Sequence, residues 1–127
     1  MVERDEHHEA ALDTWRRLEE TGARLFTTPL VIAETVTVFG RAYDREFAAR
    51  EGRKLLTSIR LTILRPALAD ELAAIDELDD LGRSPDRALA YVDCVSFAVM
   101  RASRIMRAFT FDVQHFGAAG FRVIPPV

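Results

Sequence analysis

The chain has 127 residues, of which 49% are apolar and 29% are charged, the balance of one ordinary globular domain. This composition excludes a disordered tail, a collagen-like repeat and a membrane-spanning bundle. The 17 Lys and Arg residues against 20 Asp and Glu residues give a net charge of −3, which excludes a strongly basic nucleic-acid coat. The single cysteine, Cys94, excludes an internal disulfide and a cysteine-based zinc site. We therefore expect a single cytoplasmic domain over residues 1–127, without membrane contact.

Helical and strand patterns alternate along the chain. Thr28-Pro29, Asp44 and Ser84-Pro85-Asp86 have the residue types that begin a helix. The expected helices cover residues 6–20, 45–58, 67–81, 84–103 and a short stretch after Asp112, and a further helix starts at residue 29 and ends within residues 40–43. The expected strands cover residues 25–28, 61–64, 108–111 and 121–124. Strands separated by helices predict right-handed β-α-β crossovers and a parallel sheet, whose ligands bind where strands end and helices begin.

Three acids stand out because their neighbours are apolar. Glu34 lies in the helix that begins at Pro29, Asp93 lies in the middle of the most apolar helix, and Asp112 follows a strand. Taken singly, they could be a solubilising acid, a partner for a buried polar group and a helix N-cap. Two carboxylates about 4 Å apart repel by about 4 kcal/mol at an effective dielectric of about 20, so converging acids require hard cations or proton uptake. Carboxylates suit Mg²⁺ or Mn²⁺, so we expect the three acids to meet in one metal-holding pocket.

Three segments, in this order and spacing, carry a family resemblance: Thr27–Glu34, Val92–Met100 and Phe109–Phe116, followed by Gly120–Pro125. With these segments the chain resembles a PIN-domain ribonuclease over essentially its whole length, in particular the toxin half of VapBC-type toxin–antitoxin pairs. The resemblance implies a PIN-like α/β/α sandwich with a mainly parallel sheet, about four strands of which have patterns in this sequence.

The resemblance also implies an activity, a cofactor and partners. It implies an endoribonuclease that depends on Mg²⁺ or Mn²⁺ and cleaves RNA to leave 5′-phosphate and 3′-hydroxyl ends. A cognate antitoxin protein would block the site, and the toxin would form a homodimer. Glu34, Asp93 and Asp112 would then be the catalytic, metal-holding acids of this chain.

The N-terminus departs from the family pattern. The family begins with an apolar strand that ends in an Asp, just before the helix that here starts near Glu6. This sequence begins too late to hold that central strand, and Asp5 has no strand pattern before it. Loss of a metal-holding acid should cost at least the roughly 10–100-fold that loss of a supporting residue costs. We therefore expect an N-terminally incomplete domain with impaired or no activity, whether the start is assigned too late, the chain is trimmed or the copy is decayed.

Other polar residues have weaker signals. Ser96 lies three residues after Asp93 on the same helical face, and His115 follows the Asp112 turn, so both are candidate substrate contacts. Cys94 is more typical of a small buried residue than of a nucleophile. Several basic residues could form an RNA-facing rim, although scattered solvated charge is the better explanation for most of them: Arg41, Arg45, Arg53, Lys54, Arg101, Arg104 and Arg107.

Two other functions fit parts of the pattern. A PIN-like domain without its first acid could be a non-catalytic module that dimerises or binds an antitoxin peptide, and a lack of Mn²⁺ binding would favour that alternative. A phosphoryl-accepting receiver domain also has acids near strand ends. Against it, the only lysine, Lys54, lies between predicted strands, and the acidic pair expected after a first strand is missing.

Overall fold

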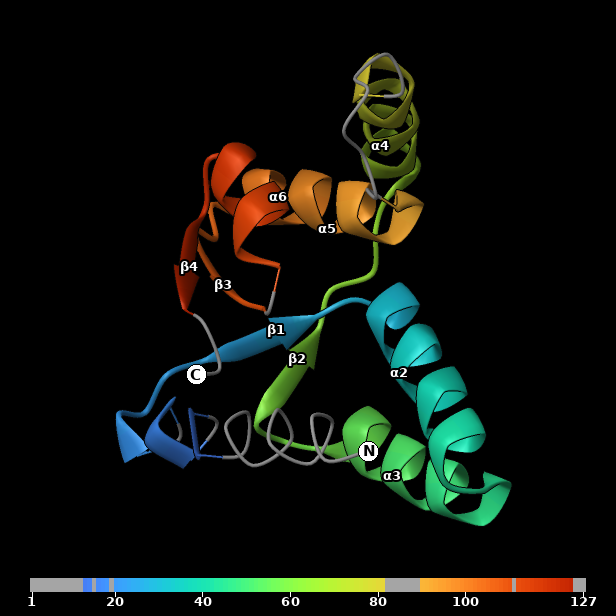
Figure 1. Cartoon of the computed structure of the whole chain (residues 1–127). Helices are drawn as coiled ribbons and strands as arrows, with labels where there is room; N and C mark the ends of the chain where they lie inside the picture. Colours follow the sequence, from blue (N-terminus) through green and yellow to red (C-terminus); the bar gives the residue numbers. More distant parts are fainter. Residues whose placement is uncertain (1–12, 15, 19, 82–89, 111, 125–127) are drawn as a thin grey trace. The chain divides into compact units, whose positions relative to one another are not determined.

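The computed structural model describes residues 13–14, 16–18, 20–81, 90–110 and 112–124 (Figure 1). The chain divides into two compact units, one of Met1–Ala23 with Ser103–Val127 and the other of Arg24–Ala102. Within the expected helix 6–20, every described residue is helical. The expected absence of a strand before that helix concerns residues outside the described part and stays a prediction, as does the single-domain organisation.

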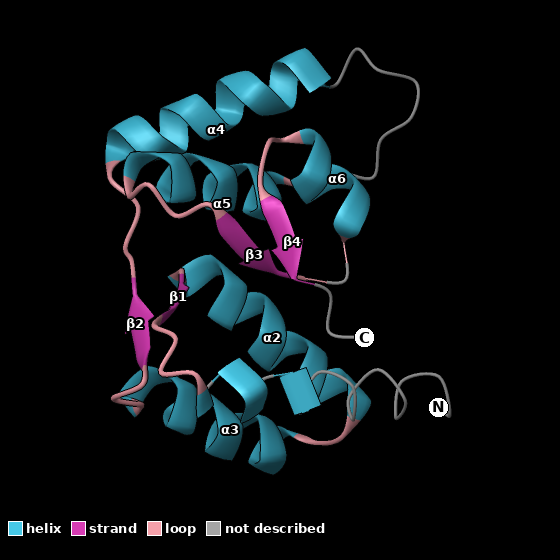
Figure 2. Cartoon of the chain, turned by 90° about the vertical axis from the view of Figure 1, so that its left-hand side faces the viewer, coloured by secondary structure: helices cyan, strands magenta, loops and turns pink. Residues whose placement is uncertain are grey.

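The second unit begins with β1 (Leu25–Thr27), α2 (Pro29–Ala42), α3 (Arg45–Thr57) and β2 (Leu61–Ile63) (Figure 2). The two strands pair in parallel, with each residue of β1 opposite one of β2. The parallel arrangement follows from the crossover through two helices, because a parallel partner needs a long connection. It confirms the prediction from the alternating pattern.

Local capping fixes where α2 and α3 begin. The Thr28 hydroxyl accepts the Val31 N–H at 3.3 Å, and the Asp44 carboxylate accepts the Phe47 N–H at 2.7 Å. Both predicted helix starts are therefore confirmed. The helix ends at Ala42, within the predicted range of residues 40–43, and the Tyr43 N–H still donates to the Phe39 carbonyl at 2.9 Å.

α2 and α3 pack closely against each other. Gly52 is buried on α3, and a Cβ added there would lie 3.1 Å from the Val36 Cγ2. Near the connection, the Phe47 ring lies 5.3 Å from the Phe39 ring and 4.7 Å from the Tyr43 ring, measured between centroids. Such aromatic pairs add to the burial energy. A small residue and an aromatic cluster therefore hold the two helices together.

The hydrophobic core of this unit lies between α4 (Leu68–Leu81) and α5 (Tyr91–Ala102). The buried cluster consists of Ala74, Cys94, Val95 and Val99, with Leu30, Leu64, Leu78 and Tyr91 packed around it. An ion pair of 3.0 Å between Glu77 and Arg101 also joins the two helices. The predicted burial of the apolar helix is confirmed. None of the described helices is long and apolar enough to cross a membrane.

The start of α5 corrects the predicted helix 84–103. Ala90 is not helical, so a continuous helix through this position is wrong, whereas the Ser84-Pro85-Asp86 signal lies outside the described residues. Asp93 is the reason for the later start: its Oδ2 accepts the Ala90 N–H at 3.3 Å, while its own N–H donates to the Ala90 carbonyl at 3.0 Å. Asp93 therefore lies in the first turn of α5 and not in the middle of the helix.

The other unit contains β3 (Arg107–Phe109), α6 (Val113–Ala118) and β4 (Arg122–Ile124). The two strands again pair in parallel. Phe116 of α6 and Phe121 before β4 are both buried, with ring centroids 6.3 Å apart. Gly120, at φ +100°, makes the turn between them in a conformation that other residues rarely adopt.

Candidate functional site

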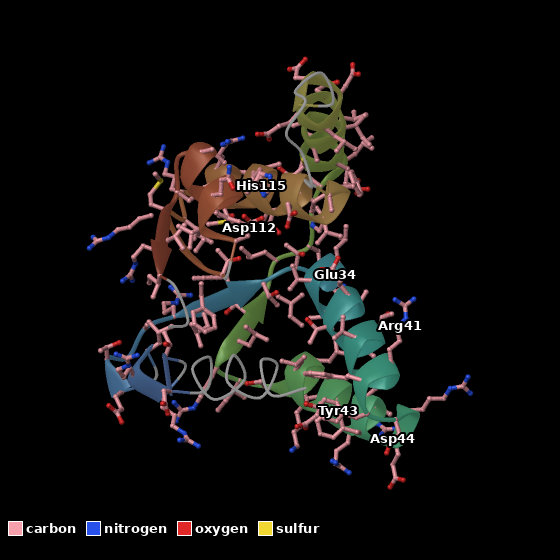
Figure 3. All side chains as sticks on the ribbon, viewed as in Figure 1. Glu34, Arg41, Tyr43, Asp44, Asp112 and His115 are labelled. Carbon is pink, nitrogen blue, oxygen red and sulfur yellow. The ribbon has the colours of Figure 1, made fainter. Side chains whose placement is uncertain are left out.

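Asp112 and His115 form the most closely connected polar pair among the predicted site residues (Figure 3). Asp112 caps α6 by accepting the His115 N–H at 3.0 Å. The His115 Nδ1 lies 3.0 Å from Oδ1 and 2.9 Å from Oδ2 of the same carboxylate. Because a carboxylate accepts hydrogen bonds, Nδ1 must carry the donated proton. The N-cap interpretation of Asp112 is confirmed, and the imidazole fixes the direction of its carboxylate.

Asp93 and Ser96 lie on α5, one turn apart. Asp93 is half-buried and ties the start of the helix to Ala90 through its carboxylate. This bond to a backbone group agrees with the interpretation of Asp93 as the partner of a polar protein group, which was the alternative to a role in metal binding. Ser96 is buried, with 9% of its surface exposed. The burial favours a role beside neighbouring protein groups over direct contact with RNA.

Glu34 lies on α2, where its side chain is exposed (Figure 3). Leu30, one turn earlier on the same face, packs against the cluster that contains Cys94 and Val95 of α5. The start of α2 therefore contributes Leu30 to the core of this unit. Glu34 is one turn further along α2 than Leu30, and its side chain is exposed.

The three acids are divided between the two units. Glu34 and Asp93 belong to Arg24–Ala102, and Asp112 belongs to the other unit. Over the described part of the chain, no group of three or more His, Cys, Asp or Glu side chains is arranged to hold a metal ion. The expected meeting of all three acids stays a prediction. Their chemistry nevertheless fits a hard divalent cation, because all three supply carboxylate oxygens.

Cys94 follows Asp93 on α5 and is fully buried in the core. Burial, followed by the charges of Glu77 and Asp93, raises the pKa of its thiol from 9.0 to about 11. The thiolate is the reactive form of cysteine, so this side chain is poorly suited to nucleophilic attack. The prediction of a buried structural cysteine is confirmed.

The candidate RNA-facing cations have different surroundings. Arg41, Arg45 and Arg53 are exposed, and Arg41 projects from α2 (Figure 3). Lys54 forms an ion pair of 3.0 Å with Glu51, and Arg101 pairs with Glu77 and lies over the Phe97 ring. Lys54 and Arg101 therefore have structural partners.

Sequence reasoning missed two interactions. The spacing of Asp112 and His115 could have revealed their side-chain contact, because residues three apart at a helix start are neighbours. The ion pair between Glu77 and Arg101 has no local signal, because 24 residues separate them.

Comparisons with known proteins identify the family. The model of the PIN domain matches residues 1–121. The 23S rRNA-specific endonuclease VapC20 of Mycobacterium tuberculosis is 32% identical over 103 residues, which cover 80% of this chain and 74% of that protein, in both strain CDC 1551 / Oshkosh and strain H37Rv. The structure is also similar to the crystal structure of M. tuberculosis VapC20, which is described as a sarcin-ricin loop cleaving toxin, with a TM-score of 0.71 and 30% sequence identity. The matched region covers 88% of this chain and 89% of the VapC20 chain.

The structural similarity confirms the predicted PIN-like α/β fold with parallel strands. The sequence match extends over nearly all of the chain and includes the positions of Glu34, Asp93 and Asp112. This chain therefore belongs to the PIN-domain family, and its relatives there are the VapC-type ribonuclease toxins.

Proposed function

We propose that this chain is a divalent-metal-dependent endoribonuclease and the toxin component of a toxin–antitoxin pair. The family match and the activity named for VapC20 support this function. The observation that carries it is the position of the acids: Asp93 is in the first turn of α5 and Asp112 caps α6, while Glu34 lies in the second turn of α2. The partial positive charge at a helix N-terminus stabilises carboxylates such as Asp93 and Asp112.

Glu34, Asp93 and Asp112 are the residues that we propose to hold Mg²⁺ or Mn²⁺. When bound, the ion supplies positive charge that stabilises the charge developing on the scissile phosphate. The protein's contribution is to fix the carboxylates. Asp93 is tied to the Ala90 N–H, and Asp112 is held by the backbone and the ring of His115. Carboxylates that are oriented in this way lose little freedom on binding an ion.

The proposed substrate is RNA, and a ribosomal stem-loop is the first one to test, because VapC20 acts on 23S rRNA. The His115 side chain is 27% exposed and oriented by Asp112, so we propose that its ring contacts the RNA phosphate. Ser96 is proposed to support Asp93 from within α5. We propose two protein partners: a cognate antitoxin that blocks the site, and a second copy of this chain in a homodimer. The proposed location of the protein is the cytoplasm.

The substitution Asp93→Asn tests this function. The Asn amide oxygen can still accept the Ala90 N–H, so the start of α5 is retained while the charge is lost. We expect Mn²⁺-dependent cleavage of the stem-loop to fall about 100-fold or more. Asp13→Asn is the matched control, because this acid is 69% exposed and pairs only loosely with Arg16, at 3.8 Å.

Two results would contradict the proposal. One is an unchanged cleavage rate in Asp93→Asn, and the other is cleavage that persists after the metal is chelated. Titration calorimetry with Mn²⁺ then separates the alternatives. A chain that binds no Mn²⁺ but still binds its antitoxin would be the non-catalytic module.

A further inference from the structure

Three exposed apolar side chains lie along one side of α4. Leu68, Leu72 and Ile75 are 71%, 56% and 50% exposed. Spacings of four and three residues place them on one face, over roughly 10 Å of helix at a rise of about 1.5 Å per residue. A different face of α4 packs on α5 through Ala74, which is fully buried. Exposed apolar side chains that share one helix face are candidates for an interaction site.

Acids flank this stripe on both sides. α4 has six Asp and Glu residues among its 14 and no basic residue. Asp70 accepts the Ala67 N–H at the helix start, and Glu77 pairs with Arg101. The remaining acids are Glu71, Asp76, Asp79 and Asp80. At about 100° per residue, Glu71 and Asp76 border the stripe on opposite sides.

We propose that this face of α4, named here the α4 face and defined by Leu68, Leu72 and Ile75 with Glu71 and Asp76, binds one amphipathic helix of a partner protein. The partner helix would present an apolar stripe bordered by Lys and Arg. Anchors at positions i, i+4 and i+7 have the spacing that a facing helix contacts. The acidic borders select a basic partner through charge complementarity.

The charge of the α4 face also argues against other occupants. A second copy docked through the same face would bring two acidic rows together, which is unfavourable. RNA would meet the same repulsion, because its backbone is negative. The α4 face includes none of Glu34, Asp93 and Asp112, so the proposal does not depend on the proposed function.

A designed peptide tests the α4 face. The probe is an 18-residue helical peptide with leucines at the spacing i, i+4 and i+7 and lysines on both borders. Its control has the same composition, with the leucines moved off one face. We expect fluorescence anisotropy with the full chain to show binding of the probe and not of the control. Added salt should weaken binding by screening the acidic borders.

Substitutions on the chain locate the binding site. Leu72→Ala should weaken binding of the probe about tenfold, because a central apolar anchor is removed. Leu56→Ala is the matched control, since Leu56 lies on α3 and is 55% exposed, compared with 56% for Leu72. The double substitution Glu71→Gln with Asp76→Asn should reduce the salt dependence, whereas Glu46→Gln on α3 should leave it unchanged.

Three outcomes would overturn the proposal. The first is no binding of the probe, and the second is equal binding to the parent chain and to Leu72→Ala, with Ile75→Ala as a second check. The third is a dimer, measured by analytical ultracentrifugation, that Leu72→Ala dissociates. That last result would assign the α4 face to a second copy. Circular dichroism of each variant confirms that the fold is retained.

Discussion

α2 and α4 each have 14 residues, but they use acids in opposite ways. α2 has one acid, Glu34, among mostly apolar and hydroxyl residues, while α4 has six acids and no base. A single exposed carboxylate such as that of Glu34 can be solvated by water or can balance one bound ion. A row of carboxylates instead creates a field over a whole face. The number of acids in a helix thus helps to distinguish a chemical site from a docking surface.

The largest expected difference between the two helices is in stability. Ile32 of α2 is 6% exposed, whereas Leu72 of α4 is 56% exposed. Ile32→Ala should lower the free energy of unfolding by about 2–5 kcal/mol, because it leaves a cavity. Leu72→Ala should change it by less than about 0.5 kcal/mol. Urea unfolding of both variants measures this, and equal losses would mean that Leu72 is covered in solution.

The second difference concerns catalysis. Glu34→Gln should reduce RNA cleavage about 100-fold, a loss typical of removing a group that holds or supports a metal ion. Asp80→Asn, a substitution of an exposed acid of α4, should leave the rate within about twofold, because it removes only a solvent-screened surface charge. Initial rates at saturating Mn²⁺ measure both. A comparable loss in the two variants would show that net charge, and not the position of Glu34, controls the activity.

The third difference lies in how the helices start. Thr28 is buried and caps α2, whereas Asp70 is the partner of a backbone N–H at the start of α4. Thr28→Ala should cost about 1 kcal/mol of stability, and Thr28→Ser should restore most of it. Asp70→Ala should cost less than about 1 kcal/mol, because this bond is exposed to water. Thermal unfolding of the three variants gives the order.

The smallest expected effect is a change in the pKa of the Cys94 thiol, caused by a substitution on α4. The negative charge of Glu77 disfavours the thiolate, so Glu77→Gln should lower the pKa of Cys94 below about 11. Burial is the larger cause and should keep the pKa above the ordinary 9.0. The Cβ chemical shift of Cys94, the only cysteine, reports the titration by NMR. If the pKa of Cys94 is the same in Glu77→Gln as in the parent chain, then burial and the remaining charges cause the whole increase above 9.0.

Local signals predicted much of the fold. Thr28 before Pro29, Asp44 and Asp112 each cap a helix as expected, because capping depends on residues only three positions apart. The alternation of strands and helices predicted parallel pairing. It could not specify the partners, since pairing of β1 with β2 and of β3 with β4 depends on contacts between distant segments. The Ser84-Pro85 signal also predicted a continuous helix, although Ala90 is not helical.

The candidate site was predicted in its residues but not in its contacts. The apolar surroundings of Glu34, Asp93 and Asp112 marked them for attention. The bond of Asp93 to Ala90 and the double contact of His115 with Asp112 appear only in the structure. The helical pattern of residues 67–81 gave no sign that Leu68 and Leu72 stay exposed, because periodicity shows that a face is apolar but not what covers it.

The close approach of Gly52 to Val36 has a consequence for natural variation. A methyl group at position 52 would lie 3.1 Å from the valine side chain, so the neighbour must yield for any larger residue to fit. An alanine at 52 should therefore occur together with a smaller residue at 36, and the two positions should change in concert when homologous toxins are aligned.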